Sequence, residues 1–369
     1  MIAPAFILSA AGGIIFRQYN KQHALIKNPN RDLVFQISLF AIFVTLGSLA
    51  ARFIFSIENT FLTLGLYTLM VPLTYWFVKK SANPLGLVKA VFWIYLFWAI
   101  VALIMQIIYY GKAEIFHSRE YLVVAVLSGL YFLAKSSFSR FLVILVIVFS
   151  AFVGHKNTAY LTAMLAIIYI SMIWALPYAK GIKDSYLRVM FWGKLLILST
   201  LLVAVIGFVY FYIKSDLPTG NPEYRLHTYE KAWDKFIQSP LWGTGFTGAA
   251  SEKFDLFTVG ISQQTLPTHS DPLDILANGG LIGFALWAVF FTRIYIRWYR
   301  FVLAPEPHVD AEIRPYLHSF FCITAAGILV CTFNPILNSP NLAWSLWNIV
   351  GVLLAVFGAA TPSEKKTIV

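Results

Sequence analysis

Long apolar runs recur along this chain and constrain its fold more than any other feature. A helix that crosses the hydrocarbon core of a bilayer needs about 20 apolar residues. Runs of roughly that length lie near residues 2–16, 33–54, 60–78, 86–110, 121–134, 140–154, 157–178, 189–213, 272–292, 316–336 and 341–360. The first is short, but it lacks the basic start and the cleavage site of a signal peptide. The pattern predicts an all-α polytopic membrane protein with about 11 transmembrane helices.

The charge content agrees with this class. Only 12% of the 369 residues are charged, whereas a soluble domain is typically about a quarter charged. The net charge of +11 could suit nucleic acid, but in a membrane protein it is explained by Lys and Arg in cytoplasmic loops, and no nucleic acid partner is expected. Cys322 and Cys331 fall in one apolar segment, which argues against a disulfide framework or a metal site.

The distribution of Lys and Arg predicts the orientation. With eleven spans, the basic connections fall on one side, which the positive-inside rule assigns to the cytoplasm. They contain Arg17, Lys21, Lys27, Arg31, Lys79, Lys80, Lys89, Lys135, Arg140, Lys180, Lys183, Arg188, Arg293, Arg297, Arg300, Arg314, Lys365 and Lys366. The N-terminus is then outside and the C-terminus inside. The outer side carries one long loop with five Lys or Arg and seven Asp or Glu at residues 214–271.

This loop divides the chain into three parts. Residues 1–213 form an N-terminal bundle of about eight spans, residues 214–271 form the outer loop, and residues 272–369 form about three spans and a short cytoplasmic tail. A transporter is a rival class, but transporters often show repeated halves with charges in mid-membrane. No repeat is visible here, and Lys194 lies near the cytoplasmic end of its span.

The outer loop begins with the signals of an amphipathic helix. Asn221 can cap it, Pro222 suits its first position, and Ser239-Pro240 ends it. One apolar stripe contains Leu226, Tyr229, Trp233, Phe236 and Ile237, and the other side contains Glu230, Lys231, Asp234 and Lys235. Such a helix either lies at the outer surface of the membrane that the chain spans or covers the helix bundle, and periodicity alone favours the second interpretation.

Three glycines follow this helix with the spacing G-x-G-x-x-G, at Gly243, Gly245 and Gly248. A dinucleotide loop with this spacing follows a strand and opens a helix, whereas these glycines follow a helix and a proline. The pattern therefore favours a tight turn that lets the backbone approach the site or the bundle. The loop ends at His269, a few residues before a span, where a histidine is either an interfacial residue or a functional one.

Two patterns around the loop resemble the bacterial O-antigen polymerase and O-antigen ligase superfamily. Members carry an Arg, an aromatic residue about one turn later, a small apolar stretch and P-x-x-G-x-G, and then H-N-x-x-L-x-x-L-x-x-x-G-x-x-G entering a span. The first pattern is fitted by Arg225, Tyr229, Ala232, Phe236, Pro240, Gly243 and Gly245. The second is fitted by His269, Leu273, Leu276, Gly280 and Gly283, with Ser270 in place of the family's Asn.

The resemblance implies a multispanning glycosyltransferase that uses undecaprenyl-diphosphate-linked glycans at the periplasmic face of the bacterial inner membrane. Arg225 is then expected to bind the donor diphosphate, because cations stabilise the charge of the leaving group. The family also places an Arg at an earlier outer turn, where this chain has Lys156, and Lys112 and Arg119 are reserve candidates. His269 is the candidate base that accepts a proton from the attacking sugar hydroxyl.

Other site residues are expected to position this machinery. Tyr229, Gly243 and Gly245 have orienting or structural roles. Asp271 and Asp274 could hold a metal with His269, but hard cations need more oxygen ligands, so we expect an orienting role for Asp271 and neither a metal nor another cofactor.

The resemblance leaves two activities open. The favoured one is a polymerase that joins lipid-linked oligosaccharide repeats, and the other is a ligase that transfers the lipid-linked glycan to lipid A core. A lipid-linked oligosaccharide transporter is a more distant alternative. The expected partners are the lipid-linked glycan, a glycan or lipid A core acceptor, the bilayer, and a flippase and a chain-length regulator as further candidates.

Overall fold

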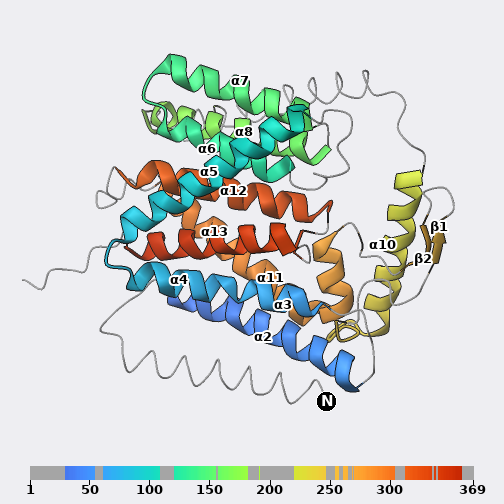
Figure 1. The fold of residues 1–369 in the computed structure, drawn as a ribbon. Helices are drawn as coiled ribbons and strands as arrows, with labels where there is room; N and C mark the ends of the chain where they lie inside the picture. The colour runs from blue at the N-terminus through green and yellow to red at the C-terminus, as the bar shows by residue number, and fades with distance from the viewer. Residues whose placement is uncertain are drawn as a thin grey trace, which may run out of the picture. The chain divides into compact units, whose positions relative to one another are not determined.

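A computed structural model shows a helical protein with one two-stranded sheet among its described residues (Figure 1). It describes residues 30–54, 61–108, 120–154, 157–181, 191, 220–246, 254–256, 261–264, 268, 270–303, 312–334, 336–337 and 340–359. The chain forms two compact units, one from residues 1–84, 219–297 and 331–369 and the other from residues 85–218 and 298–330. Each unit is therefore assembled from segments that lie far apart in the sequence.

The first unit contains both patterns of the resemblance. Its elements are α2 (Arg31–Ile54), α3 (Leu62–Thr68), α4 (Met70–Lys80), α10 (Gly220–Gln238), β1 (Phe254–Leu256), β2 (Ile261–Gln264), most of α11 (Asp271–Leu303) and α13 (Pro340–Ala359). Helix α13 packs along α4, and α2 packs along α3. The rings of Phe291 in α11 and Trp347 in α13 stack with their centroids 5.7 Å apart. The antiparallel strands β1 and β2 lie in the segment predicted as a loop.

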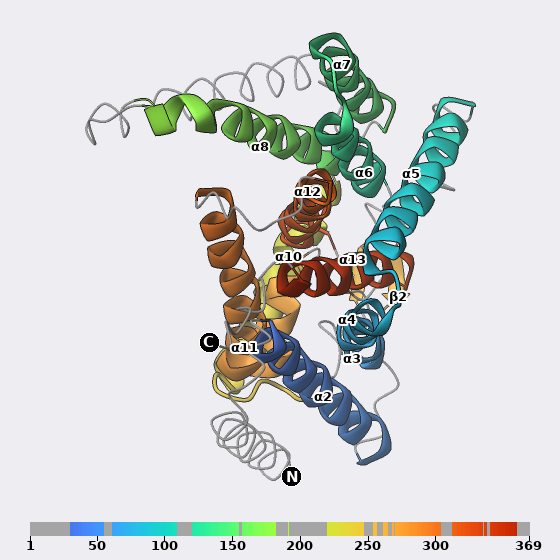
Figure 2. The same ribbon diagram turned by 90° about the vertical axis from the view of Figure 1, so that its left-hand side faces the viewer.

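The second unit gathers the middle of the chain. It contains nearly all of α5 (Pro84–Ile108) and α12 (Arg314–Cys331), together with α6 (Glu120–Leu133), α7 (Ser137–Gly154) and α8 (Asn157–Gly181). Helices α6, α7 and α8 pack against one another (Figure 2). Their shared core contains Val124, Ile147 and Ala163. The Tyr169 hydroxyl of α8 and Nδ1 of His318 in α12 form a hydrogen bond at 2.7 Å.

The predicted spans that fall within the described residues lie on helices, but fewer of them qualify as crossings than expected. In the described part of the chain, six helices are long and apolar enough to cross a membrane, at Arg31–Ile54, Pro84–Ile108, Ser137–Gly154, Thr158–Leu176, Asp271–Tyr299 and Arg314–Cys331. Tyr121–Leu133 and Leu342–Val356 are shorter apolar helices. The spans predicted near 2–16 and 189–213 lie outside the described residues. The count of about eleven is therefore not established.

One predicted span is divided in two. Residues 60–78 form α3 and α4, which meet at Leu69. Pro72 follows three residues after this point, and a proline ring clashes with the carbonyl group four residues before it and cannot donate a hydrogen bond there. That carbonyl belongs to Thr68, the last residue of α3. The division follows from a proline that the hydropathy pattern does not register.

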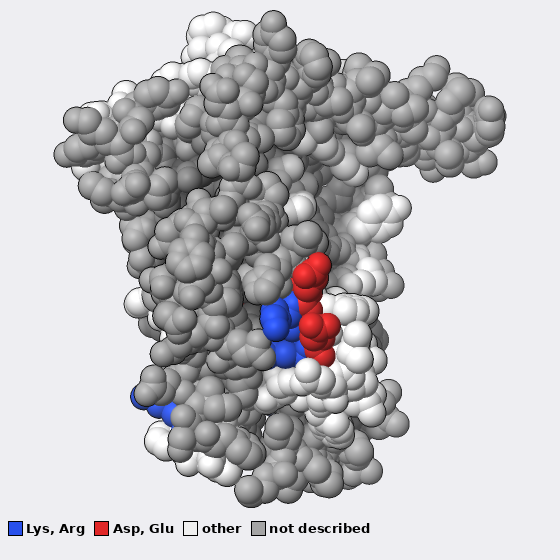
Figure 3. Space-filling model, turned by 90° about the vertical axis from the view of Figure 1, so that its right-hand side faces the viewer, with Lys and Arg blue, Asp and Glu red and all other residues white. Residues whose placement is uncertain are grey.

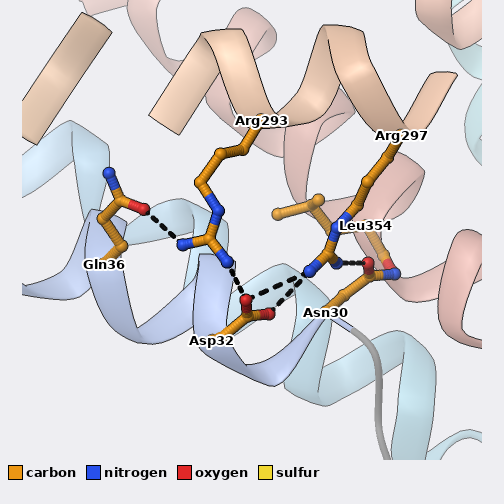
Figure 4. A network of polar contacts seen from close by, with 6 residues as sticks. All are labelled: Asn30, Asp32, Gln36, Arg293, Arg297 and Leu354. Atoms are coloured by element: carbon orange, nitrogen blue, oxygen red, sulfur yellow. Dashed lines mark hydrogen bonds and ion pairs between the residues drawn. The ribbon is translucent and has the colours of Figure 1, made fainter. Parts of the chain in front are cut away.

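A polar network joins the start of α2 to the distal part of α11 (Figure 4). Asp32 accepts hydrogen bonds from Arg293 and Arg297, and the Nη2–Oδ1 distance to Arg297 is 2.8 Å. Arg293 also donates to Gln36 at 2.8 Å, and Asn30 donates to the carbonyl oxygen of Leu354 in α13. The start of α2 and the distal part of α11 therefore lie next to one another, and the predicted orientation of both relative to the membrane stays a prediction.

Candidate functional site

Helix α10 packs through its smallest side chains. Thr228 and Ala232, one turn apart, are 2% and 0% exposed. The Thr228 hydroxyl donates a hydrogen bond to the carbonyl oxygen of Arg225 at 3.0 Å. Trp233 and Ile237, which belong to the predicted apolar stripe, are 50% and 59% exposed. The interpretation that this stripe covers the bundle is therefore wrong for these two residues, because the packing face is the one with the small side chains.

The charged side of α10 is nearly balanced. Glu230 and Asp234 are exposed, and Lys231 and Lys235 are partly buried. Acidic and basic side chains lie next to one another on the face of the molecule where α10 lies (Figure 3). Because acidic and basic side chains alternate here, this surface of α10 has little net charge.

The turn after α10 docks onto α11 through backbone hydrogen bonds. The amide of Thr244 donates to the carbonyl oxygen of Ala277 at 3.2 Å. The amides of Gly245 and Phe246 both donate to the carbonyl oxygen of Asn278, at 3.0 and 3.2 Å. These carbonyl groups belong to a helix, where they would ordinarily accept from amides four residues later. The amides of Leu281 and Ile282, which would ordinarily donate to these carbonyl groups, must therefore point elsewhere.

A break in α11 at Gly280 redirects these two amides. Gly280 has φ 59° and ψ −167°, which are not helical values, and a positive φ is most accessible to glycine. Beyond the break, the amides of Leu281 and Ile282 donate to the carbonyl oxygens of Pro240 and Leu241 at 2.8 and 3.3 Å. The two segments thus exchange hydrogen bonds in both directions, and the two patterns of the resemblance form one interlocked structure.

Phe246 anchors this structure inside the protein. Its side chain is 1% exposed and meets the ring of Phe43 from α2 edge-on, with centroids 5.5 Å apart. A Cβ atom on Gly47 or Gly279 would lie 3.0 or 2.7 Å from the Phe246 ring. The Phe246 carbonyl oxygen accepts a hydrogen bond from the amide of Phe61, just before α3. The turn is therefore held against α2, α3 and α11 together.

The interlocked backbone predicts different outcomes at two glycines. A Cβ atom on Gly243 would lie 2.2 Å from the carbonyl carbon of Asn278, and φ at Gly243 is +69°. Gly243→Ala should therefore separate the turn from α11 and cost about 2–4 kcal/mol. A Cβ atom on Gly283 would meet only ring atoms, the nearest on Phe43 at 3.1 Å, so Gly283→Ala should cost less. Thermal unfolding of both variants in detergent measures the difference, and equal unfolding temperatures would contradict the docking role of Gly243.

Hydrogen bonds to carboxylates and from a hydroxyl connect the first turn of α11 to neighbouring segments. Oδ2 of Asp271, a residue 2% exposed, accepts hydrogen bonds from the amides of Ile336 and Leu337 at 2.7 and 2.9 Å. Oδ1 of Asp274 accepts one from the amide of Thr268 at 3.3 Å. The Thr268 hydroxyl donates to the carbonyl oxygen of Ser270 at 2.9 Å. Thr268 and Ser270, the two neighbours of His269 in the sequence, are thus fixed relative to α11.

Two oppositely charged residues near this turn have buried atoms without partners among the described residues. These atoms are Nε of Arg225 and Oδ2 of Asp274. Burial raises the pKa of Tyr229, the positive charge of Arg225 lowers it, and the negative charge of Asp274 raises it. Both charges therefore act on the same phenol, which brings α10 and the start of α11 into one electrostatic environment.

Several predicted site residues lie outside the described part of the chain. They are His269, Lys156, Lys112 and Arg119. Among the described residues, no group of three or more His, Cys, Asp or Glu side chains could hold a metal ion. The described part of the predicted site therefore consists of Arg225, Tyr229, Asp271 and the glycine turn, and the structure adds Asp274, Thr268 and Phe246 to it.

Part of the chain matches a known protein family. Residues 123–288 match the family described as O-antigen ligase. The matched segment begins within α6 and ends within α11, and it includes α10, the glycine turn and the break at Gly280. No curated protein matches the chain. The match confirms the resemblance predicted from the two sequence patterns.

Proposed function

We propose that this chain, which carries an O-antigen ligase family domain at residues 123–288, polymerises undecaprenyl-diphosphate-linked oligosaccharide repeat units. The reaction takes place at the periplasmic face of the bacterial inner membrane. The hydroxyl oxygen of one glycan attacks the anomeric carbon of another, the bond from that carbon to the phosphate oxygen breaks, and undecaprenyl diphosphate leaves. The family match supports the class of reaction, and the interlocked α10–α11 structure supports the position of the site.

Arg225 supports the binding of the diphosphate. Its Nε atom is buried and has no partner among the described residues, and a buried donor without a partner costs free energy. A guanidinium group donates in a fork that matches phosphate oxygens. An anionic oxygen of the donor lipid would satisfy this atom and stabilise the negative charge that develops as the sugar–phosphate bond breaks. Lys156 is proposed as a second cation for the same diphosphate.

His269 is proposed as the base. A sugar hydroxyl is a poor nucleophile until its proton is removed, and a neutral imidazole removes protons effectively near pH 7. His269 lies between Thr268 and Ser270, which are hydrogen-bonded to each other and, through Thr268, to Asp274. His269 is proposed to accept the proton that the attacking sugar hydroxyl loses as the new glycosidic bond forms.

The description of the matched family favours a second candidate function, which is ligation of the glycan to lipid A core. Both activities use the same donor, so only the acceptor distinguishes them. The test is incubation of the purified protein with lipid-linked repeat units, with and without lipid A core. A ladder of products without core identifies a polymerase, whereas product that forms only with core identifies a ligase. No product under either condition would refute the proposed class of reaction.

Transfer is expected to proceed without a metal ion. The carboxylate oxygen Oδ2 of Asp271 already accepts two backbone hydrogen bonds, and a hard cation would require several free oxygen ligands. Cationic side chains such as Arg225 can neutralise the diphosphate instead. The rate of transfer should therefore be unchanged in excess EDTA. Loss of activity on chelation, with recovery on adding magnesium, would contradict this expectation and make Asp271 and Asp274 candidate ligands.

A further inference from the structure

Asp274 has one carboxylate oxygen that is buried and has no hydrogen-bond partner among the described residues. The residue is 2% exposed. Its Oδ1 atom accepts from the amide of Thr268 at 3.3 Å, while its Oδ2 atom is buried and has no partner among the described residues. Asp271, one turn earlier and equally buried, instead receives two backbone amides on its Oδ2. Within the described part of the chain, Asp271 is therefore held by two amides on one oxygen, whereas one oxygen of Asp274 remains without a hydrogen bond.

An open buried carboxylate oxygen requires a hydrogen-bond donor. A buried polar atom without a partner costs about 1–3 kcal/mol, and more when the group is charged. Folded proteins retain few such atoms, and an exception calls for a functional explanation. The cost at Asp274 is recovered if a bound molecule supplies an O–H or N–H group to Oδ2.

The second open atom has the opposite requirement. Nε of Arg225 is a buried donor that needs an acceptor. The segment that follows Arg225 and the helix that contains Asp274 are joined by the backbone hydrogen bonds of the glycine turn, and both charged residues also act on Tyr229. We therefore assign the two atoms to one region between α10 and the start of α11. A ligand that satisfies both must combine an anionic oxygen with a hydroxyl or amide N–H group. A sugar joined to a diphosphate has this combination, whereas the diphosphate alone has no hydroxyl or amide group to offer Asp274.

We propose that Asp274 is a sugar-binding residue, whose open Oδ2 atom accepts a hydrogen bond from a hydroxyl or amide group of the glycan while Arg225 binds the diphosphate. This assignment rests on the proposed function and adds the group that recognises the sugar. Arg225 then holds the part that all donor lipids share, and Asp274 contacts the part that differs between glycans. Asp274 thereby contributes to selecting which glycan is transferred.

The test compares two lipids that differ only in the sugar. Purified wild-type protein and Asp274→Asn are titrated with undecaprenyl diphosphate and with undecaprenyl-diphosphate-linked repeat unit, without acceptor. Asparagine keeps an oxygen for the Thr268 amide and replaces the open oxygen by an NH₂ group. Loss of this hydrogen bond should weaken binding of the repeat-unit lipid about 3- to 10-fold and leave undecaprenyl diphosphate unaffected. Arg225→Ala should weaken binding of both lipids.

Asp271→Asn is the matched control, since it removes a buried carboxylate from the same helical turn. The ratio of its affinities for the two lipids should equal that of the wild type. An unfolding temperature for Asp274→Asn close to that of the wild type excludes misfolding as the cause of its loss. If donor affinity is unchanged and only the KM for the acceptor glycan rises, the recognised hydroxyl belongs to the acceptor, and the sugar-binding role still holds.

Two results would overturn the assignment. One is equal weakening of both lipids in Asp274→Asn, which would make Asp274 part of the diphosphate site or of the fold. The other is wild-type affinity for both lipids together with an unchanged KM for the acceptor. A failure of the proposed function is recognised separately, because the wild-type protein would then bind neither lipid and form no product.

Discussion

Arg225→Ala is expected to abolish glycan transfer and to weaken binding of the donor lipid about 10- to 100-fold. The reason is that Arg225 has a buried Nε atom with no partner among the described residues, and a hydrogen bond to a charged group contributes about 1.5–3 kcal/mol. The loss in rate should exceed the loss in affinity, because charge on the diphosphate increases as the sugar–phosphate bond breaks. Equilibrium binding and single-turnover transfer with saturating donor separate the two effects.

Two further variants decide whether the effect depends on the guanidinium group. Arg225→Lys retains the positive charge but loses the fork geometry, so it should recover only part of the activity. Lys231→Ala is the matched control, since it removes one positive charge from the same helix at a position roughly 240° around the helix axis from Arg225. Transfer at the wild-type rate in Arg225→Ala, or an equal loss in Lys231→Ala, would remove Arg225 from the mechanism.

Lys156→Ala should resemble Arg225→Ala but with a milder loss. A lysine binds phosphate as a point charge, without the two parallel hydrogen bonds of arginine. Donor affinity measured for Lys156→Ala tests this assignment. Unchanged affinity would direct attention to Lys112 or Arg119 as the second cation.

The two sequence patterns predicted part of the backbone packing between the glycine turn and α11. The spacing of Gly243 and Gly245 favoured a tight turn with a close backbone approach, and the structure has such an approach. The surface that the turn approaches could not be predicted, because its partners Ala277 and Asn278 lie more than 30 residues later. In the sequence Gly280 was only one residue of a pattern. Its positive φ could not be predicted, because the break in the helix is matched by hydrogen bonds to the glycine turn.

The packing face of α10 was predicted poorly for a physical reason. Periodicity assumes that the apolar stripe faces the protein, which holds where water is the alternative. At a membrane interface the apolar side chains can face lipid instead, and the helix can pack against the protein through its small residues. Thr228 and Ala232 provide that close face, and Trp233 and Ile237 stay exposed. Exposed apolar side chains beside a charged face suit a helix at the membrane interface, the alternative that periodicity disfavoured.

Asp274 illustrates a different limit of sequence reasoning. From the sequence it was one of two acidic residues near a histidine, and both were weighed as metal ligands. Only the structure separates them, because Asp271 accepts hydrogen bonds from the amides of Ile336 and Leu337, while Oδ2 of Asp274 has no partner among the described residues. Those amides belong to a segment more than 60 residues away. Burial and hydrogen-bond satisfaction are tertiary properties, and identical residue types one turn apart can therefore have different roles.

His269→Ala should lower the rate of transfer by about 10²–10⁴, the usual effect of losing a positioned acid–base group. The histidine lies outside the described residues, but Thr268 and Ser270 on either side of it are joined by hydrogen bonds at 2.9 and 3.3 Å. The variant should fold normally and still bind the donor lipid, because the cations for the diphosphate remain. Single-turnover transfer with saturating donor isolates the chemical step from binding.

The pH dependence of transfer provides an independent readout of the same base. A histidine has an unperturbed pKa of about 6.5, and only its neutral form accepts a proton. Wild-type activity should therefore fall as the pH drops below about 6 to 6.5, while the residual activity of His269→Ala should lack this decline. His227→Ala, which removes another histidine of the same loop, should keep the wild-type rate and pH profile. If His269→Ala turns over at the wild-type rate, or its residual activity keeps the acid decline, the base must be another group.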